Sequence, residues 1–114
     1  MAVRVVHYRQ VPAEPVAEAE GVTIRWLITR SDGAPNFAMR LFELPPGSGS
    51  PHHRHDWEHE VFILDGEGLL RTEAGDFPLQ PGTAVLVPGG ELHQFYNNGS
   101  GLLRFLCLIP HPRE

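Results

Sequence analysis

The sequence predicts an all-β fold, either a small barrel or a sandwich, and two observations carry this prediction. The chain has 12 glycines and 11 prolines among 114 residues, and they are spread along its length between the apolar runs. Between them lie short runs rich in Val, Ile, Leu and Phe, a pattern typical of all-β sandwiches and barrels. No segment has the apolar stripe of a helix: Pro12–Glu20 is rich in Ala and Glu, but prolines interrupt it.

The apolar runs define the expected strands in chain order. These are Arg4–Tyr8, Val22–Thr29, Phe37–Leu44, Glu60–Leu64, Gly68–Thr72, Asp76–Pro78, Ala84–Val87, His93–Asn97 and Leu102–Ile109. In the second run, Val22, Ile24, Trp26 and Ile28 alternate with the residues between them, which is the period of a half-buried strand. The third and the last run alternate in the same way, so we expect their two faces to differ.

Turns and the domain outline follow from the residues between the strands. Asp65–Gly66 and Pro81–Gly82 are turn dipeptides, because glycine reaches positive φ without a Cβ clash. Pro12–Glu20 is predicted to be a loop or an arm over the barrel. We therefore expect a strand and arm over residues 1–21 and a single β-barrel domain over residues 22–114.

Composition excludes several classes of protein. Nine Lys and Arg against 14 Asp and Glu leave a formal net charge of −5, which disfavours nucleic-acid binding. Cys107 is the only cysteine, so an intrachain disulfide and a thiolate zinc finger are both excluded. No run is long enough to span a membrane, and the first residues lack a signal-peptide core. The sequence thus predicts a soluble cytoplasmic protein with no nucleic-acid or membrane partner.

Histidines are the compositional anomaly, because four of the seven fall between residues 52 and 59. His53 and His55 are two apart, so on a strand both side chains point to the same side of the sheet. His59 follows after a short gap, and His93 follows a turn at Pro88–Glu91 that redirects the chain. Imidazole suits Zn, Fe, Cu, Ni and Mn, so these residues are candidates for a transition-metal site.

The spacing of these residues resembles the two motifs of the cupin family. The first motif is present as Gly47, five residues, His53-Arg54-His55, three residues, His59, six residues and Gly66. The second is present as Gly82, five residues, Pro88-Gly89-Gly90, two residues, His93, three residues and Asn97. One position departs from the family pattern, since His59 stands where cupins usually have Glu.

The resemblance implies a fold and a ligand set. The fold would be a double-stranded β-helix, the jelly-roll-like cupin barrel, of the small single-domain cupin 2 type. The metal ligands carried over by position are His53, His55, His59 and His93. Glu60 is the rival for the third place, because the family tolerates a gap of four residues there. The step of six residues to Gly66 favours His59, and the surrounding run resembles small cupins with four-histidine sites.

The same resemblance sets the expected chemistry. Histidines add no charge, so a divalent ion would keep its full charge and act as a strong Lewis acid. We expect one divalent transition metal per chain, with Mn or Fe favoured and Zn, Ni or Cu also suited. The implied function is a metalloenzyme acting on a small carbonyl, enol or alkene compound, by dioxygenase-like or isomerase/cyclase-type chemistry. The alternatives are a cupin that binds a sugar or organic acid without turnover, and a structural barrel whose metal only stabilises the fold.

Strand parity predicts the pocket lining. If Arg104 points outward, Leu103, Phe105, Cys107 and Ile109 point inward. Phe37, Met39 and Leu41 are the candidates from the opposite strand, and Arg40 would then be a surface arginine. The predicted substrate pocket is Phe37, Met39, Phe105, Cys107 and Ile109, although each of these residues would also suit a barrel core.

Assembly is predicted from the ends of the chain. Val3–Val6 and Leu102–Ile109 are apolar strands that would be liabilities if they lay unpaired at a sheet edge. Small cupins commonly pair sheets or exchange N-terminal strands, so the resemblance implies a homodimer.

Overall fold

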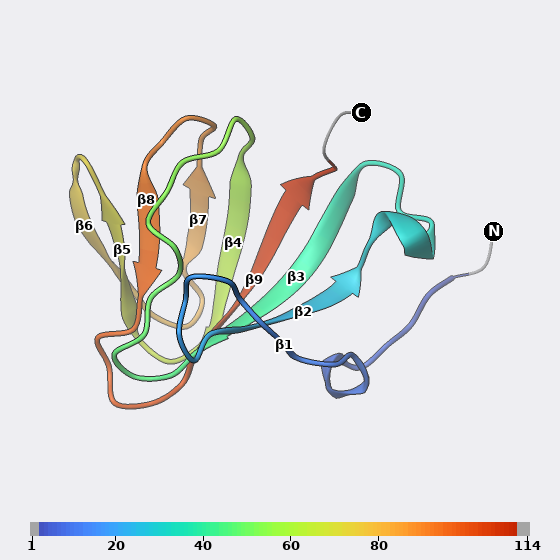
Figure 1. Cartoon of the computed structure of the whole chain (residues 1–114), viewed down its shortest axis with the longest axis horizontal. Coiled ribbons are helices and arrows are strands. Elements are labelled where there is room, and N and C mark those ends of the chain that lie inside the picture. The colour runs from blue at the N-terminus through green and yellow to red at the C-terminus, as the bar shows by residue number, and fades with distance from the viewer. Residues whose placement is uncertain (1–2, 112–114) are drawn as a thin grey trace.

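The computed structural model describes residues 3–111, which form two antiparallel sheets (Figure 1). The six-stranded sheet has the order β1-β2-β3-β9-β4-β7, and the three-stranded sheet has the order β6-β5-β8. The strands are β1 Glu14–Pro15, β2 Thr23–Ile28, β3 Phe37–Leu44, β4 His59–Asp65, β5 Gly68–Thr72, β6 Gly75–Leu79, β7 Ala84–Val87, β8 His93–Tyr96 and β9 Leu103–Pro110. The only helices in this part of the chain are two short 3-10 turns, η1 Tyr8–Gln10 and η2 Arg30–Asp32. The predicted all-β fold is confirmed.

The core lies between the two sheets. Leu70 and Phe95 come from the three-stranded sheet, and Val61, Ile63 and Phe105 come from the six-stranded one. Strand β4 shows why the layers form: His59, Val61 and Ile63 are buried while the residues between them are exposed. The alternation of the sequence therefore becomes one inner and one outer face.

The first predicted strand, Arg4–Tyr8, is wrong. These residues run without strand pairing into η1, and Val3 and Val5 are 89% and 90% exposed. A strand needs the backbone of a neighbouring strand to pair with, and the edge of β2 makes other hydrogen bonds instead. Its start pairs with β1 through Ile24 and Thr23, and the Leu27 carbonyl accepts a hydrogen bond from Arg4 Nε at 3.2 Å.

The last strand, β9, is central and not an edge. It pairs along its length with β3 and, on its other side, with β4. Its burial alternates, with Leu103, Phe105, Cys107 and Ile109 facing the core as predicted. The expectation that this segment is an unpaired edge is wrong, because a crossover inserts the end of the chain between two earlier strands.

The second-motif asparagine closes one end of the barrel. Asn97 is fully buried, and its Nδ2 donates hydrogen bonds of 2.8 Å to the carbonyls of Leu44 and Gly101. Its Oδ1 accepts one from Gly99 N at 2.9 Å. One amide thus joins β3, β8 and the turn before β9. Nearby, Gly66 (φ 83°) lies so close to the Leu102 carbonyl that a Cβ would overlap it.

No helix within residues 3–111 has the length and apolar character needed to cross a membrane.

Candidate metal centre

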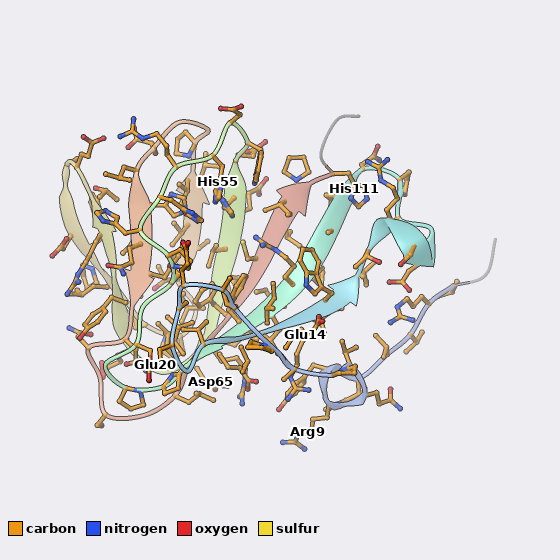
Figure 2. All side chains as sticks on the ribbon, in the orientation of Figure 1. Arg9, Glu14, Glu20, His55, Asp65 and His111 are labelled. Carbon is orange, nitrogen blue, oxygen red and sulfur yellow. The ribbon has the colours of Figure 1, made fainter. Side chains whose placement is uncertain are left out.

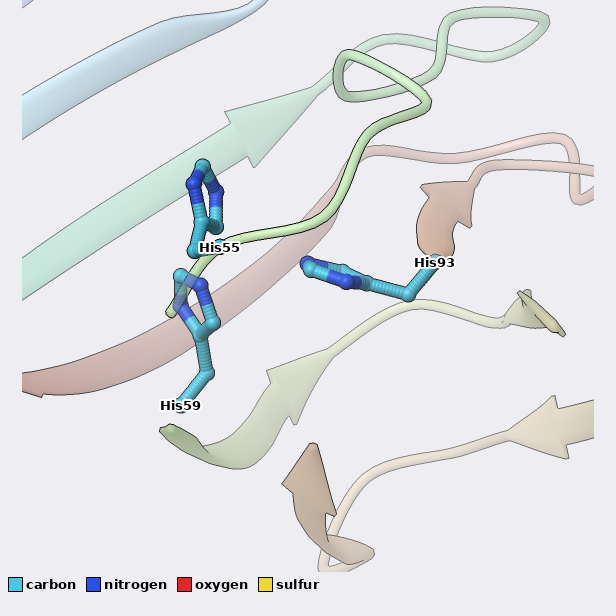
Figure 3. Close-up of side chains that lie close together, drawn as sticks. All are labelled: His55, His59 and His93. Atoms are coloured by element: carbon cyan, nitrogen blue, oxygen red, sulfur yellow. The ribbon is translucent and has the colours of Figure 1, made fainter. Parts of the chain in front are cut away.

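Three histidines from three places in the chain meet between the sheets. His59 is the first residue of β4, His93 is the first residue of β8, and His55 lies in the loop before β4. One ring nitrogen of each lies within 4.8 Å of the others (Figure 3). The cluster sits near the start of β4, at the opposite end of that strand from Asp65 (Figure 2).

Backbone hydrogen bonds fix the loop that carries His53 and His55. His53 forms an isolated antiparallel bridge with His93, with N–H···O distances of 3.2 and 3.1 Å. Gly90 N donates to the His55 carbonyl at 2.6 Å. At Gly89 a Cβ would lie 2.6 Å from the Asp56 carbonyl oxygen, so this close approach requires glycine. The Pro-Gly-Gly turn of the second motif therefore holds the histidine loop of the first.

Hydrogen bonds also set which ring nitrogens face the cluster. His93 Nδ1 lies 2.9 Å from the Glu91 carbonyl, which can only accept, so Nδ1 carries the proton. His59 Nδ1 lies 3.3 Å from both Cys107 Sγ and Arg40 Nη2, while its Nε2 is buried without any partner in the described structure. The Nε2 lone pair of His93 is therefore free to bind a ligand, and Nε2 is the ring nitrogen of His59 that the described protein groups leave open.

The environment keeps the three rings neutral. Burial, helped by the charge of Arg40, lowers the pKa of His59 to about 3. Burial is also the main cause that lowers the pKa of His55 and of His93, and the nearby His53 acts in the same direction on each. Metal binding requires unprotonated imidazole, so all three groups are in the binding form at neutral pH.

The two remaining candidate ligands lie differently. His53 is exposed, and its ring centroid is 4.1 Å from that of His55 and 6.2 Å from that of His93. It lines the same cavity but lies outside the group of three. Glu60 is exposed on the outer face of β4, because it neighbours the inward-facing His59. Of the two rivals for the third place, His59 is therefore the one in the cluster.

The histidines line a cavity of about 310 Å³ with largely aromatic and aliphatic walls. Three of the five predicted pocket residues, Phe105, Cys107 and Ile109, line it. The other two, Phe37, which is 54% exposed, and Met39, are not among the residues that line it. The opposite face of β3 points inward, because the register pairs Arg40 with the inward-facing Cys107.

Arg40 is thus an inward residue that sequence reasoning placed on the surface. It is 9% exposed, and its Nη2 donates to Cys107 Sγ at 2.9 Å and lies 3.3 Å from His59 Nδ1. Both faces of β3 carry apolar residues, so parity alone could not choose between them. Trp26, opposite Arg40 in the register, also lines the cavity and was likewise not predicted there.

Cys107 links these groups. Its sulfur is the shared neighbour of Arg40 Nη2 and His59 Nδ1, both of which can donate to it. Burial raises the pKa of the Cys107 thiol, although Arg40 acts in the opposite direction. Cys107 is therefore a buried thiol that accepts a hydrogen bond from Arg40 and contacts the His59 ring at Nδ1.

Comparison with known proteins decides the family. The family model described as a cupin domain matches residues 40–109, well over half of the chain. The chain belongs to the cupin family. Among the relatives of this cupin, the oxalate-binding protein of Thermotoga maritima is 39% identical over 74 residues, 61% of each chain. Auxin-binding protein 1 of Arabidopsis thaliana is 33% identical over 76 residues, 59% of this chain and 38% of that protein. The matches thus span less than two thirds of either relative.

Solved structures resemble this cupin over nearly its whole length. The polyketide cyclase RemF from Streptomyces resistomycificus superposes with a TM-score of 0.91 and 36% identity, covering 98% of this chain and 82% of the cyclase. A predicted oxalate decarboxylase from Thermotoga maritima superposes with a TM-score of 0.83 and 28% identity, covering 96% of this chain and all of the other. These likenesses confirm the predicted cupin barrel.

The side chains of this cupin fit a transition metal. Three neutral imidazole nitrogens converge, and the buried Nε2 of His59 has no partner among residues 3–111 to satisfy it. A buried polar atom without a partner is costly, and a bound ion would satisfy it. The nitrogen donor set suits the first-row transition metals better than Mg or Ca.

Proposed function

We propose that this cupin is a metal-dependent enzyme that acts on a small dicarbonyl or enol compound, with cyclase-type chemistry first among the reactions considered. The observation that supports it is the convergence of His55, His59 and His93 on a cavity with apolar walls. In this proposal His53 is a fourth ligand, which its place on the cavity wall beside His55 and opposite His93 favours.

The proposed cofactor is one divalent transition metal per chain, with Mn or Fe first and Zn, Ni and Cu as the other candidates. When bound to histidines alone, such an ion supplies Lewis acidity toward carbonyl and enolate oxygens. The histidine side chains hold the ion, and the buried hydrogen bonds of His59 and His93 fix their orientation.

The cavity walls suit a flat, mostly apolar substrate. Phe42, Phe95 and Phe105 line one side, with ring centroids of Phe95 and Phe105 4.8 Å apart. Such walls exclude water and hold a flexible chain in a folded conformation, which lowers the entropy cost of an intramolecular reaction. Trp57, stacked on His55 at 4.7 Å, borders the same cavity.

The likeness to a polyketide cyclase supports cyclase-type over dioxygenase-like chemistry. That likeness extends over 98% of this chain at 36% identity. A cyclisation by aldol condensation forms one carbon–carbon bond, releases one water and consumes no oxygen. Oxygen uptake with 1,3-diketones therefore separates the two reactions, since only a dioxygenase consumes O₂.

The first test is metal content, measured by elemental mass spectrometry on protein purified without a tag. We expect about one transition-metal ion per chain in the wild type and in Glu60→Ala, and at least a tenfold loss in His59→Ala. Glu60 is the matched control, because it is adjacent but faces outward. The metal-loaded protein is then assayed with a linear triketone for the absorbance of an aromatic product. A wild type that stays metal-free after reconstitution contradicts the proposal.

The second candidate function is binding without turnover. It is favoured by the relatives named oxalate-binding and auxin-binding proteins, at 39% and 33% identity. In that case organic acids raise the melting temperature of the metal-loaded protein, while no product forms from any dicarbonyl substrate.

A further inference from the structure

Arg40 carries a buried positive charge that no described acidic group neutralises. Its side chain is nine-tenths buried, and the two polar groups within reach of Nη2 are Cys107 Sγ and His59 Nδ1. Its Nε is buried with no hydrogen-bond partner in the described structure. Taking a guanidinium out of water is expensive unless an anion compensates for it.

Aromatic rings hold the guanidinium in place without neutralising it. The Arg40 Cζ lies 4.9 Å from the centroid of the Phe42 ring and 5.5 Å from that of Trp26. The register places Trp26, Arg40 and Cys107 side by side across β2, β3 and β9, all on the cavity wall. Arg40 is therefore preorganised on a rigid sheet, as a binding group needs to be.

The cavity as a whole lacks negative charge. Among the described residues that line it there is no Asp and no Glu, and its ionisable groups are Arg40, four histidines and Cys107. The nearest acidic candidate along β4, Glu60, faces the other side of the sheet. A metal ion on neutral histidines would add further positive charge, so the cavity favours an anionic guest.

We propose that Arg40 is a substrate-binding residue that pairs with a carboxylate on a flat, otherwise apolar substrate. This inference rests on the proposed function, because it places the carboxylate beside the histidine cluster. A carboxylate is fully ionised at neutral pH, and its planar shape matches the guanidinium fork. A phosphate is a poorer fit, because the mainly aromatic and aliphatic walls offer few further donors to a doubly charged group.

The test compares a charged and a neutral ligand of the same shape. Binding of 2-naphthoate and of 2-naphthamide is measured by isothermal titration calorimetry, with the chelator-treated and the metal-loaded protein. We expect wild type to bind naphthoate at least tenfold more tightly than naphthamide in both forms. Arg40→Gln should remove that preference, and Arg40→Lys should restore part of it.

Two controls keep the test specific. Arg71→Gln removes an arginine that stacks on Tyr96 away from the cavity, and naphthoate binding should not change. The melting temperature of metal-free Arg40→Gln should equal or exceed that of the wild type, because an uncompensated buried charge has been removed. A residue retained only for stability would give a lower melting temperature.

The outcomes separate this inference from the proposed function. Naphthoate binding that requires metal but is unchanged in Arg40→Gln overturns the inference and leaves the metal enzyme intact. Equal affinity for naphthoate and naphthamide in wild type also overturns it. A wild type that holds no metal, yet binds naphthoate through Arg40, contradicts the proposed function and supports the inference.

Discussion

At the scale of single residues, His59 and Arg40 define the site, because both are polar side chains buried in an otherwise apolar environment. His59 and Arg40 lie 3.3 Å apart, between His59 Nδ1 and Arg40 Nη2, and are 6% and 9% exposed. Each also has a buried nitrogen, His59 Nε2 or Arg40 Nε, without a partner in the part of the chain that the structure describes. Such orphaned groups are rare in folded proteins, and they point to ligands that complete them.

Acid should destabilise the metal-free protein through His55, His59 and His93, whose pKa values are lowered in the folded chain. An unfolded histidine has a pKa near 6.5, whereas the folded chain lowers that of His59 to about 3. Between these values the unfolded state binds more protons, so the free energy of unfolding falls as the pH drops below about 6.5. The slope is at most about 1.4 kcal/mol per pH unit for each such histidine. Above that range the pKa difference contributes nothing.

Urea unfolding of the chelator-treated protein at pH 8, 7, 6 and 5 measures this dependence. His59→Gln should flatten the curve between pH 7 and 5. His52→Gln, an exposed histidine of the same segment, should leave it unchanged. A wild-type curve that is flat below pH 6.5 would contradict the prediction.

At the scale of elements, the decisive segment is the loop between β3 and β4, which carries His53 and His55. It has no strand of its own, yet it runs beside β8 (Figure 1). Ser50 N donates to the Phe95 carbonyl at 2.8 Å, and Asn97 N donates to the Ser48 carbonyl at 2.9 Å. These contacts give the loop the geometry of a strand, so histidines two apart share a side.

Asn97→Ala should destabilise the barrel by removing the bonds that close its end. Three hydrogen bonds are lost, and two carbonyls and one amide lose a buried partner. We expect the free energy of unfolding to fall by about 2–4 kcal/mol. Urea denaturation measures it, and Asn98→Ala, at an exposed neighbour, serves as the control with a change within about 0.5 kcal/mol. Equal effects of the two substitutions would show that the buried amide is not the anchor.

At the scale of the whole molecule, the outer face of the six-stranded sheet carries exposed apolar side chains. Phe62 on β4 is 46% exposed, and Leu86 on β7 is 60% exposed. The register places Phe62 opposite Leu106, which is half-buried on β9. Because β9 is paired on both sides, its edge is not available to a second copy of the chain. The exposed apolar face of the sheet is the surface that a second copy would cover.

The homodimer stays a prediction, and sedimentation equilibrium tests it. We expect twice the chain mass of 12.7 kDa at micromolar concentrations. Phe62→Lys should shift the protein toward the monomer, because it places a charge in the proposed contact. Val5→Lys, on the exposed N-terminal segment, should have no effect. If only Val5→Lys dissociates the dimer, the N-terminal segment forms the contact instead, and a single-chain mass for wild type excludes the dimer.

The sequence by itself determined the all-β class, nearly every strand after residue 21 and the histidines of the candidate site. These features depend on local rules: turn residues end strands, alternation marks a half-buried strand, and the spacing of His53, His55, His59 and His93 matches a family pattern. Only the tertiary structure decided that Arg40 faces the cavity, that Glu60 faces away and that β9 lies at the centre of its sheet. The physical reason is that β3 is apolar on both faces, so its inner face is chosen by pairing with a strand more than 60 residues away. Arg4–Tyr8 shows the same limit, because an apolar run becomes a strand only where a free edge accepts it.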